Sequence, residues 1–132
     1  MKAIDTNVLV RFLVRDDELQ AKAIYSIFKQ AEADKEEFWV PLLVVLETLW
    51  VLESVYEIPR QQILDSMSEL LLMPILKFEN QSAIQRFIFS GREGKIDLSD
   101  LLIAHSAKSS GCKCVLTFDK SASKFELFEL IG

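Results

Sequence analysis

Apolar residues recur every three or four positions along several stretches of the chain, which predicts amphipathic helices. The clearest stretch runs from Asp17 to Ala33, with acidic residues at its start and Lys29 near its end, as the helix dipole favours. Further helices are predicted at residues 8–14, 41–56, 59–73, 80–89 and 97–109. Their ends carry suitable residues: Pro41 for a first turn, Asn80 or Ser82 for an N-cap and Gly111 for a C-terminal cap.

Short apolar runs between these helices predict strands. The runs are Lys2–Ile4, Phe38–Val40, Ile75–Phe78 and Cys114–Phe118. Strands that alternate with helices favour a parallel sheet covered by helices, because parallel neighbours need a crossover connection. No tight hairpin is indicated before the last few residues, which leave room for one. The pattern predicts an α/β fold in a single domain of residues 1–132.

The composition agrees with one compact domain and bears on where in the cell the protein is found. Half of the 132 residues are hydrophobic, and no run approaches the roughly 20 apolar residues that span a bilayer. The first residues lack the apolar stretch of a secretory signal peptide. We therefore expect a soluble, cytoplasmic protein with no membrane partner. The net charge of −5 argues against a protein that coats nucleic acid, but it does not exclude nucleic-acid chemistry.

Two acidic residues are placed by the pattern where a functional crevice is expected, and two more can face it. In an open parallel sheet this crevice lies at the carboxyl ends of the strands. Asp5 follows the first predicted strand and Asp119 follows the last. Asp97 and Asp100 begin a helix whose first turn can face the same crevice.

Glu47 is a fifth candidate because it interrupts an apolar helix. Its neighbours on both sides are almost all apolar, and a buried unpaired carboxylate is costly. The nearest basic residues in sequence, Lys35 and Arg60, lie more than one helical turn away. We expect a metal ion as the partner, with a distant arginine as the alternative.

The available donors favour a hard cation. Oxygen ligands dominate, with a single histidine, His105, and two cysteines, Cys112 and Cys114, which we expect to be reduced thiols rather than a zinc or redox site. Mg²⁺ or Mn²⁺ is therefore expected, held by carboxylates and water, and such a water can act as a nucleophile on a phosphodiester.

Four motifs together carry a resemblance to a known family. They are Asp5-Thr6-Asn7, the lone Glu47 in the helix after the second strand, Asp100-Leu101-Leu102-Ile103-Ala104, and Leu116-Thr117-Phe118-Asp119-Lys120. In this order they resemble the PIN-domain family, in particular the ribonuclease toxins of bacterial and archaeal toxin–antitoxin pairs. The likeness covers nearly the whole chain and implies a three-layer α/β/α sandwich with a short central parallel sheet.

The resemblance implies a role for each motif residue. Asp5, Glu47, Asp100 and Asp119 would be the catalytic, metal-binding quartet, with Asp97 as a fifth ligand. Thr6, Asn7 and Thr117 would support the metal-site loops or contact a phosphate. The family further implies an RNA substrate, a homodimer and an inhibiting antitoxin protein. One departure is the tail, where no second acid follows soon after Asp119.

Each candidate also has an ordinary structural explanation. Asp97 and Asp100 suit the N-terminus of a helix, Asp5 and Asp119 suit turns after strands, and Glu47 can face solvent. His105 is expected to pack or lie on the helix surface. Several cations are expected mainly as solvated charges, with about a third contacting RNA phosphates: Arg11, Arg15, Arg86, Arg92, Lys95 and Lys120.

The spacing of large apolar residues suggests a core and an interface. The candidates are Phe12, Ile24, Phe28, Leu43, Leu46 and Trp50. A chain of this length cannot bury every apolar helix face, so we expect some of them to meet a second copy of the chain through the early helices.

Other functions remain open on the sequence alone. A small magnesium phosphohydrolase lacks support because no glycine-rich phosphate loop or Asp-x-Asp pair follows the first strand. A phosphoacceptor receiver domain requires an acidic pair that Asp5-Thr6-Asn7 does not supply. A catalytically inactive scaffold is disfavoured because no acid of the quartet is missing.

Overall fold

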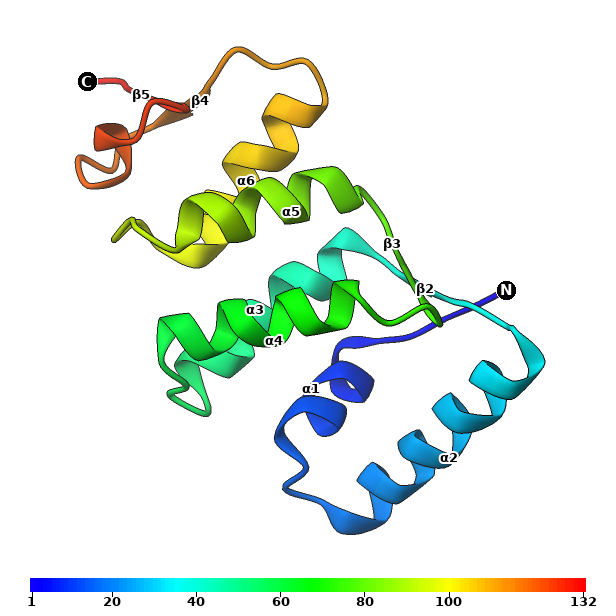
Figure 1. Ribbon diagram of the computed structural model, residues 1–132. Coiled ribbons are helices and arrows are strands. Elements are labelled where there is room, and N and C mark those ends of the chain that lie inside the picture. Colours follow the sequence, from blue (N-terminus) through cyan, green and yellow to red (C-terminus); the bar gives the residue numbers. More distant parts are fainter. The chain divides into compact units, whose positions relative to one another are not determined.

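The computed structural model describes residues 1–132 and divides them into two compact units (Figure 1). The N-terminal unit comprises Met1–Glu79, and the C-terminal unit comprises Asn80–Gly132. Helices and short parallel strands occur in both, which confirms the predicted α/β class. No helix combines the length and the apolar character that a membrane crossing would need.

The N-terminal unit is a three-stranded parallel sheet with four helices. Its elements are β1 (Lys2–Ala3), α1 (Thr6–Val14), α2 (Glu18–Asp34), β2 (Phe38–Val40), α3 (Leu42–Ser54), α4 (Arg60–Leu71) and β3 (Leu76–Phe78). The strand order is β1-β2-β3, with Lys2 opposite Phe38 and Phe38 opposite Leu76. Helix α1 packs against α2 and α3, and α3 packs against α4, which also contacts β3. Each predicted element of this unit is confirmed within a few residues.

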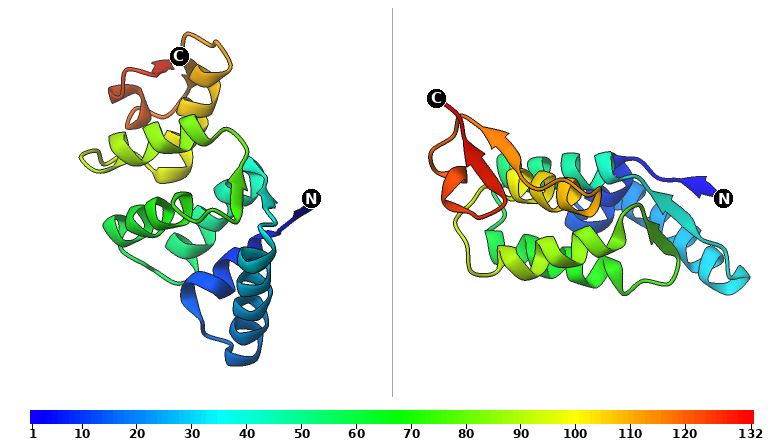
Figure 2. Two further views of the ribbon diagram at one scale, coloured as in Figure 1. Left: turned by 45° about the vertical axis from the view of Figure 1, so that its right-hand side comes forward. Right: turned by 90° about the horizontal axis from the view of Figure 1, so that it is seen from above.

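The C-terminal unit is a helical pair followed by a two-stranded sheet. Helix α5 (Gln81–Gly91) and helix α6 (Leu98–Ser109) lie side by side in every view (Figure 2). Strand β4 (Val115–Thr117) pairs in parallel with β5 (Phe128–Leu130), and the 3-10 helix η1 (Ala122–Lys124) lies in the crossover between them. Because these two strands are parallel, the chain does not end in a hairpin, which the sequence pattern had left possible.

The helix ends follow the predicted chemistry, with Asn80 as the exception. Gly111 adopts a positive φ of 92° shortly after the last residue of α6, as a C-terminal cap requires. Asn80 instead occupies the left-handed region at the start of α5 and makes no cap bond, and its side chain accepts a hydrogen bond from Ser109. Pro41 cannot cap α3 with its side chain, and the Glu79 carboxylate accepts a hydrogen bond from the Leu42 N–H at 2.9 Å instead.

The predicted core is only partly correct. Ile24 and Phe28 are buried, and Phe12 and Leu46 are half-buried. Leu43 and Trp50 are 78% and 57% exposed, so their assignment to the core is wrong. Helix α3 is apolar on nearly all sides, and it buries Val45, Thr48, Leu49 and Leu52 in place of these two.

Candidate active site

In the N-terminal unit, a hydrogen bond connects the first two acidic motifs. Asp5 is the N-cap of α1, and its Oδ1 accepts a hydrogen bond from the Val8 N–H at 3.1 Å. The next residue, Thr6, is buried and donates its hydroxyl to Oε1 of Glu47 on α3. Thr6 therefore fixes one end of α1 against α3 and orients Glu47, which is compatible with the supporting role expected of it.

Glu47 itself is not buried, contrary to the expectation from its apolar neighbours. The side chain is exposed, and its hydrogen-bond partner is Thr6 rather than a basic residue. The apolar residues around it in sequence point to other sides of α3. Burial is therefore no argument for a metal at Glu47, and its candidacy depends on the motif and on the contact with Thr6. Asn7, from the same motif as Thr6, is exposed.

In the C-terminal unit, Asp97 has the structural role that its position predicts. It is the N-cap of α6, and its Oδ1 accepts hydrogen bonds from the N–H groups of Ser99 at 3.0 Å and Asp100 at 3.2 Å. These bonds occupy one carboxylate oxygen. Oδ2 is left without a hydrogen bond and can still serve a ligand.

Asp119 organises the turn after β4 in a similar way. Its Oδ1 accepts hydrogen bonds from the N–H groups of Ser121 at 2.8 Å and Ala122 at 3.3 Å, where η1 begins. Its own N–H donates to the Thr117 hydroxyl at 3.0 Å. Thr117 thus holds the Asp119 loop, which is compatible with the supporting role expected of it.

The three acids of this unit line one pocket. Asp97, Asp100 and Asp119 border a cavity of about 590 Å³, which we call the acidic pocket. Its other lining residues are Gly94, Lys95, Ile96, Ser121, Ala122, Lys124 and Phe125. The sequence did not single out Lys124, because its place at the pocket depends on the turn that η1 makes after Asp119.

The electrostatics of the acidic pocket disfavour a full set of negative charges. The pKa of Asp100 is raised, first by burial and then by the charges of Asp97 and Asp119. Three carboxylates in one cavity repel one another and attract a cation. This pattern fits the hard-oxygen donors that Mg²⁺ and Mn²⁺ prefer.

The carboxylates of the acidic pocket are too far apart to enclose a bare metal ion. No group of three or more metal-binding side chains is arranged closely enough to hold an ion without help. Mg²⁺ commonly takes one or two carboxylates and keeps several waters, so the acidic pocket is compatible with a hydrated ion.

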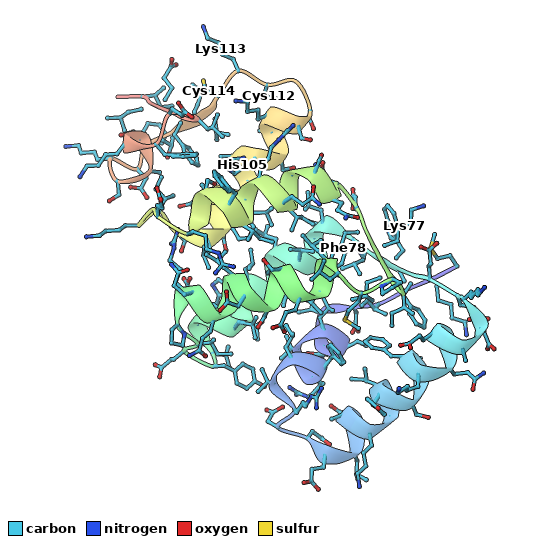
Figure 3. The ribbon with its side chains drawn as sticks, viewed as in Figure 1. Lys77, Phe78, His105, Cys112, Lys113 and Cys114 are labelled. Atoms are coloured by element: carbon cyan, nitrogen blue, oxygen red, sulfur yellow. The ribbon has the colours of Figure 1, made fainter.

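His105 is a packing residue, as predicted. It lies on α6 in the C-terminal unit (Figure 3). Its side chain is 8% exposed and packs against Phe125 with ring centroids 6.0 Å apart. Its Nε2 and the Ser90 hydroxyl share a hydrogen bond of 2.6 Å, whereas Nδ1 has no partner. Burial lowers the pKa of His105, with smaller contributions from Lys108 and Arg86.

The two cysteines are free thiols and form no disulfide, as expected. Cys112 and Cys114 lie with Lys113 in the loop between α6 and β4 (Figure 3). Cys112 is exposed and Cys114 is half-buried.

Comparison with known proteins identifies the family. The chain is 29% identical over 126 residues to the VapC ribonuclease of Aquifex aeolicus (strain VF5), an alignment that covers 94% of this chain and 91% of that protein. No solved structure is significantly similar to the chain. Residues 2–126 match the PIN domain family, a range that extends over both units and includes all five candidate acids. The chain therefore belongs to the PIN domain family, as its four motifs predicted.

Proposed function

We propose that this protein is an endoribonuclease of the toxin type, which hydrolyses phosphodiester bonds in RNA. The observation that carries the proposal is the convergence of Asp97, Asp100 and Asp119 on one pocket in a chain of the PIN domain family. The relative with 29% identity is a VapC ribonuclease, which supports the same activity here.

We further propose that the reaction depends on Mg²⁺ or Mn²⁺. Asp100 and Asp119 would hold the cation in the acidic pocket, with Oδ2 of Asp97 as a further donor. When bound, the cation would supply Lewis acidity that lowers the pKa of a water and draws in a phosphate. Its charge would also offset the burial and the repulsion that together raise the pKa of Asp100.

The chain's own residues then have distinct tasks. Asp5 and Glu47 are proposed to serve the same reaction as Asp100 and Asp119, because all four belong to the motif set. Thr6 keeps Glu47 in one orientation by donating its hydroxyl to Oε1. Thr117 keeps the Asp119 loop in place. Glu47 or Asp100 would help to orient the water that attacks the phosphodiester.

The partners follow from the proposed toxin role. RNA is the proposed substrate, and an antitoxin protein that inhibits the enzyme is the proposed regulator. A homodimer is the proposed assembly. A small gene for such a protein next to this one would support the toxin role.

The deciding experiment measures cleavage of mixed cellular RNA by the purified protein with Mg²⁺, with Mn²⁺ and with a chelator. We expect cleavage only with a divalent cation. Asp5→Asn and Asp100→Asn, one from each unit, should each reduce the rate on the order of 100-fold, because each removes a charged donor.

The control is Glu32→Gln, which removes an exposed acid on α2. Glu32 belongs neither to the acidic pocket nor to the motifs of Asp5 and Glu47. It should cleave at the wild-type rate. Equal activity in the wild type and both aspartate variants, with folding verified by circular dichroism, would show a contaminating nuclease and refute the proposal.

A further inference from the structure

Charge is distributed unevenly between the two units. The N-terminal unit has eight lysines and arginines against fourteen aspartates and glutamates, a net charge of −6. The C-terminal unit has seven against six, a net charge of +1. The overall charge of −5 therefore hides a unit that is slightly basic even though it contains the acidic pocket. A polyanion is repelled less by this unit than by the other.

Two of the seven cations of the C-terminal unit line the acidic pocket itself. Lys95 comes from the loop before α6, and Lys124 comes from the end of η1. The aspartates of the same pocket come from the start of α6 and from the turn after β4. The pocket therefore carries three negative and two positive side chains, and the two lysines reach it from separate segments.

The two lysines are not paired with the aspartates of the pocket. Neither Lys95 nor Lys124 forms an ion pair or a side-chain hydrogen bond. If their role were to neutralise the acids, they would be expected to form ion pairs with Asp97, Asp100 or Asp119, and they form none.

We propose that Lys95 and Lys124 form a phosphate-binding pair that holds the RNA backbone in the acidic pocket. The inference rests on the proposed ribonuclease function and adds the residues that recognise the substrate backbone. An ammonium group is a compact charge with three rotatable donors, which suits the non-bridging oxygens of a phosphodiester. Such a pair is needed here because three carboxylates alone would repel the phosphate that has to approach them.

The test separates substrate binding from cleavage. Binding of a short, fluorescently labelled single-stranded oligoribonucleotide is followed by anisotropy in the presence of a chelator, for the wild type, Lys95→Gln, Lys124→Gln and the double variant. Each single variant should weaken binding several-fold. The slope of log K against log salt concentration should become shallower by about 0.7 for each phosphate of a single strand that a lysine no longer neutralises.

Two matched variants make the result specific. Lys113→Gln removes an exposed lysine in the loop after α6, where Figure 3 shows it pointing outward, and it should bind RNA like the wild type. Lys124→Arg keeps the charge and should retain most of the binding. Weakening of binding in Lys113→Gln equal to that in the pocket variants would indicate a diffuse surface field and overturn the proposal.

Cation binding and kinetics complete the design. Removal of a positive charge beside the carboxylates should leave the Mg²⁺ affinity unchanged or higher, whereas a disrupted pocket would lower it. With Mg²⁺ present, the pocket variants should raise KM for RNA more than they lower kcat. If the wild type neither binds nor cleaves RNA, the proposed function itself fails. If the wild type cleaves and all lysine variants match it, only the phosphate-binding pair is refuted.

Discussion

In three of the candidate acids one carboxylate oxygen serves the backbone, and the other is available to a ligand. In Asp5, Asp97 and Asp119, Oδ1 accepts backbone N–H groups of the residues that follow. Oδ2 is left without a hydrogen bond. The structural and functional explanations of these residues are therefore compatible, because a cap or turn former can still be a ligand. For these residues, the sequence does not force a choice between the role of a cap or turn former and the role of a ligand.

His105 gives a residue-scale prediction for the pH dependence of stability. Because burial lowers its pKa in the folded state, the unfolded chain binds more protons than the folded chain just below the ordinary histidine pKa of about 6.5. The contribution of neutral His105 is therefore fully present above that pH and is lost as the pH falls. The Tm of the wild type should drop by several degrees between neutral and mildly acidic pH, and His105→Gln should reduce this drop.

The control for this prediction is Ser90→Ala. It removes the hydroxyl that bonds Nε2 but leaves the ring buried against Phe125, so its pH dependence should persist. Identical Tm profiles in the wild type and His105→Gln would mean that other groups cause the acid sensitivity.

At the scale of elements, the helix termini depend on side chains from near and far. Helix α6 is capped by its own preceding residue, Asp97, whereas α3 is capped by Glu79 from the end of β3. The first type of cap follows from sequence. The second joins residues 37 positions apart and requires the parallel register of β2 and β3 to bring them together.

Asp97 allows a prediction that separates its two roles. Asp97→Ala should lower the free energy of unfolding by about 1 kcal/mol, because the variant cannot form the cap bonds. Asp97→Asn should keep stability close to the wild type, since an asparagine oxygen caps as well. If Asp97 is also a ligand of the proposed cation, Asp97→Asn should still reduce RNA cleavage by about 10-fold. Full activity of a stable Asp97→Asn variant would leave Asp97 as a cap only.

Most helices and strands can be predicted because proline, glycine and apolar periodicity mark their limits. The last strand, β5, escapes prediction because Phe128–Leu130 is short and has a glutamate at its centre. The buried face of α3 is hard to predict because the helix is apolar on nearly every side, so periodicity does not distinguish Leu49 from Trp50. Four motifs are enough to identify the family, whereas the neighbourhood of Lys124 depends on the path of the chain through η1.

At the scale of the whole molecule, the N-terminal unit leaves several large apolar side chains exposed to water, which is energetically unfavourable. Leu43 and Trp50 are seven residues apart and share one face of α3. On α2, Leu19 is 82% exposed and Ile27 is 55% exposed. Exposed apolar residues that gather on a surface are typical of an area that another protein covers.

We predict that a second copy of the chain covers these residues. Light scattering at micromolar concentrations should give twice the mass of the single chain. Leu43→Glu and Trp50→Glu should each shift the protein toward the monomer, because each places a charge in an apolar interface. Leu72→Glu, at an exposed position after α4, is the matched control and should not change the mass. A monomeric wild type at all concentrations would exclude the dimer.

The divided use of the aspartate oxygens has a practical consequence. An asparagine at position 119 retains an oxygen for the backbone bonds that hold its loop, while the residue loses the charge that the proposed cation needs. Such a protein should be harmless to the cells that produce it and still recognise its target. Cross-linking it to cellular transcripts would then reveal which messages or structural RNAs the intact enzyme attacks.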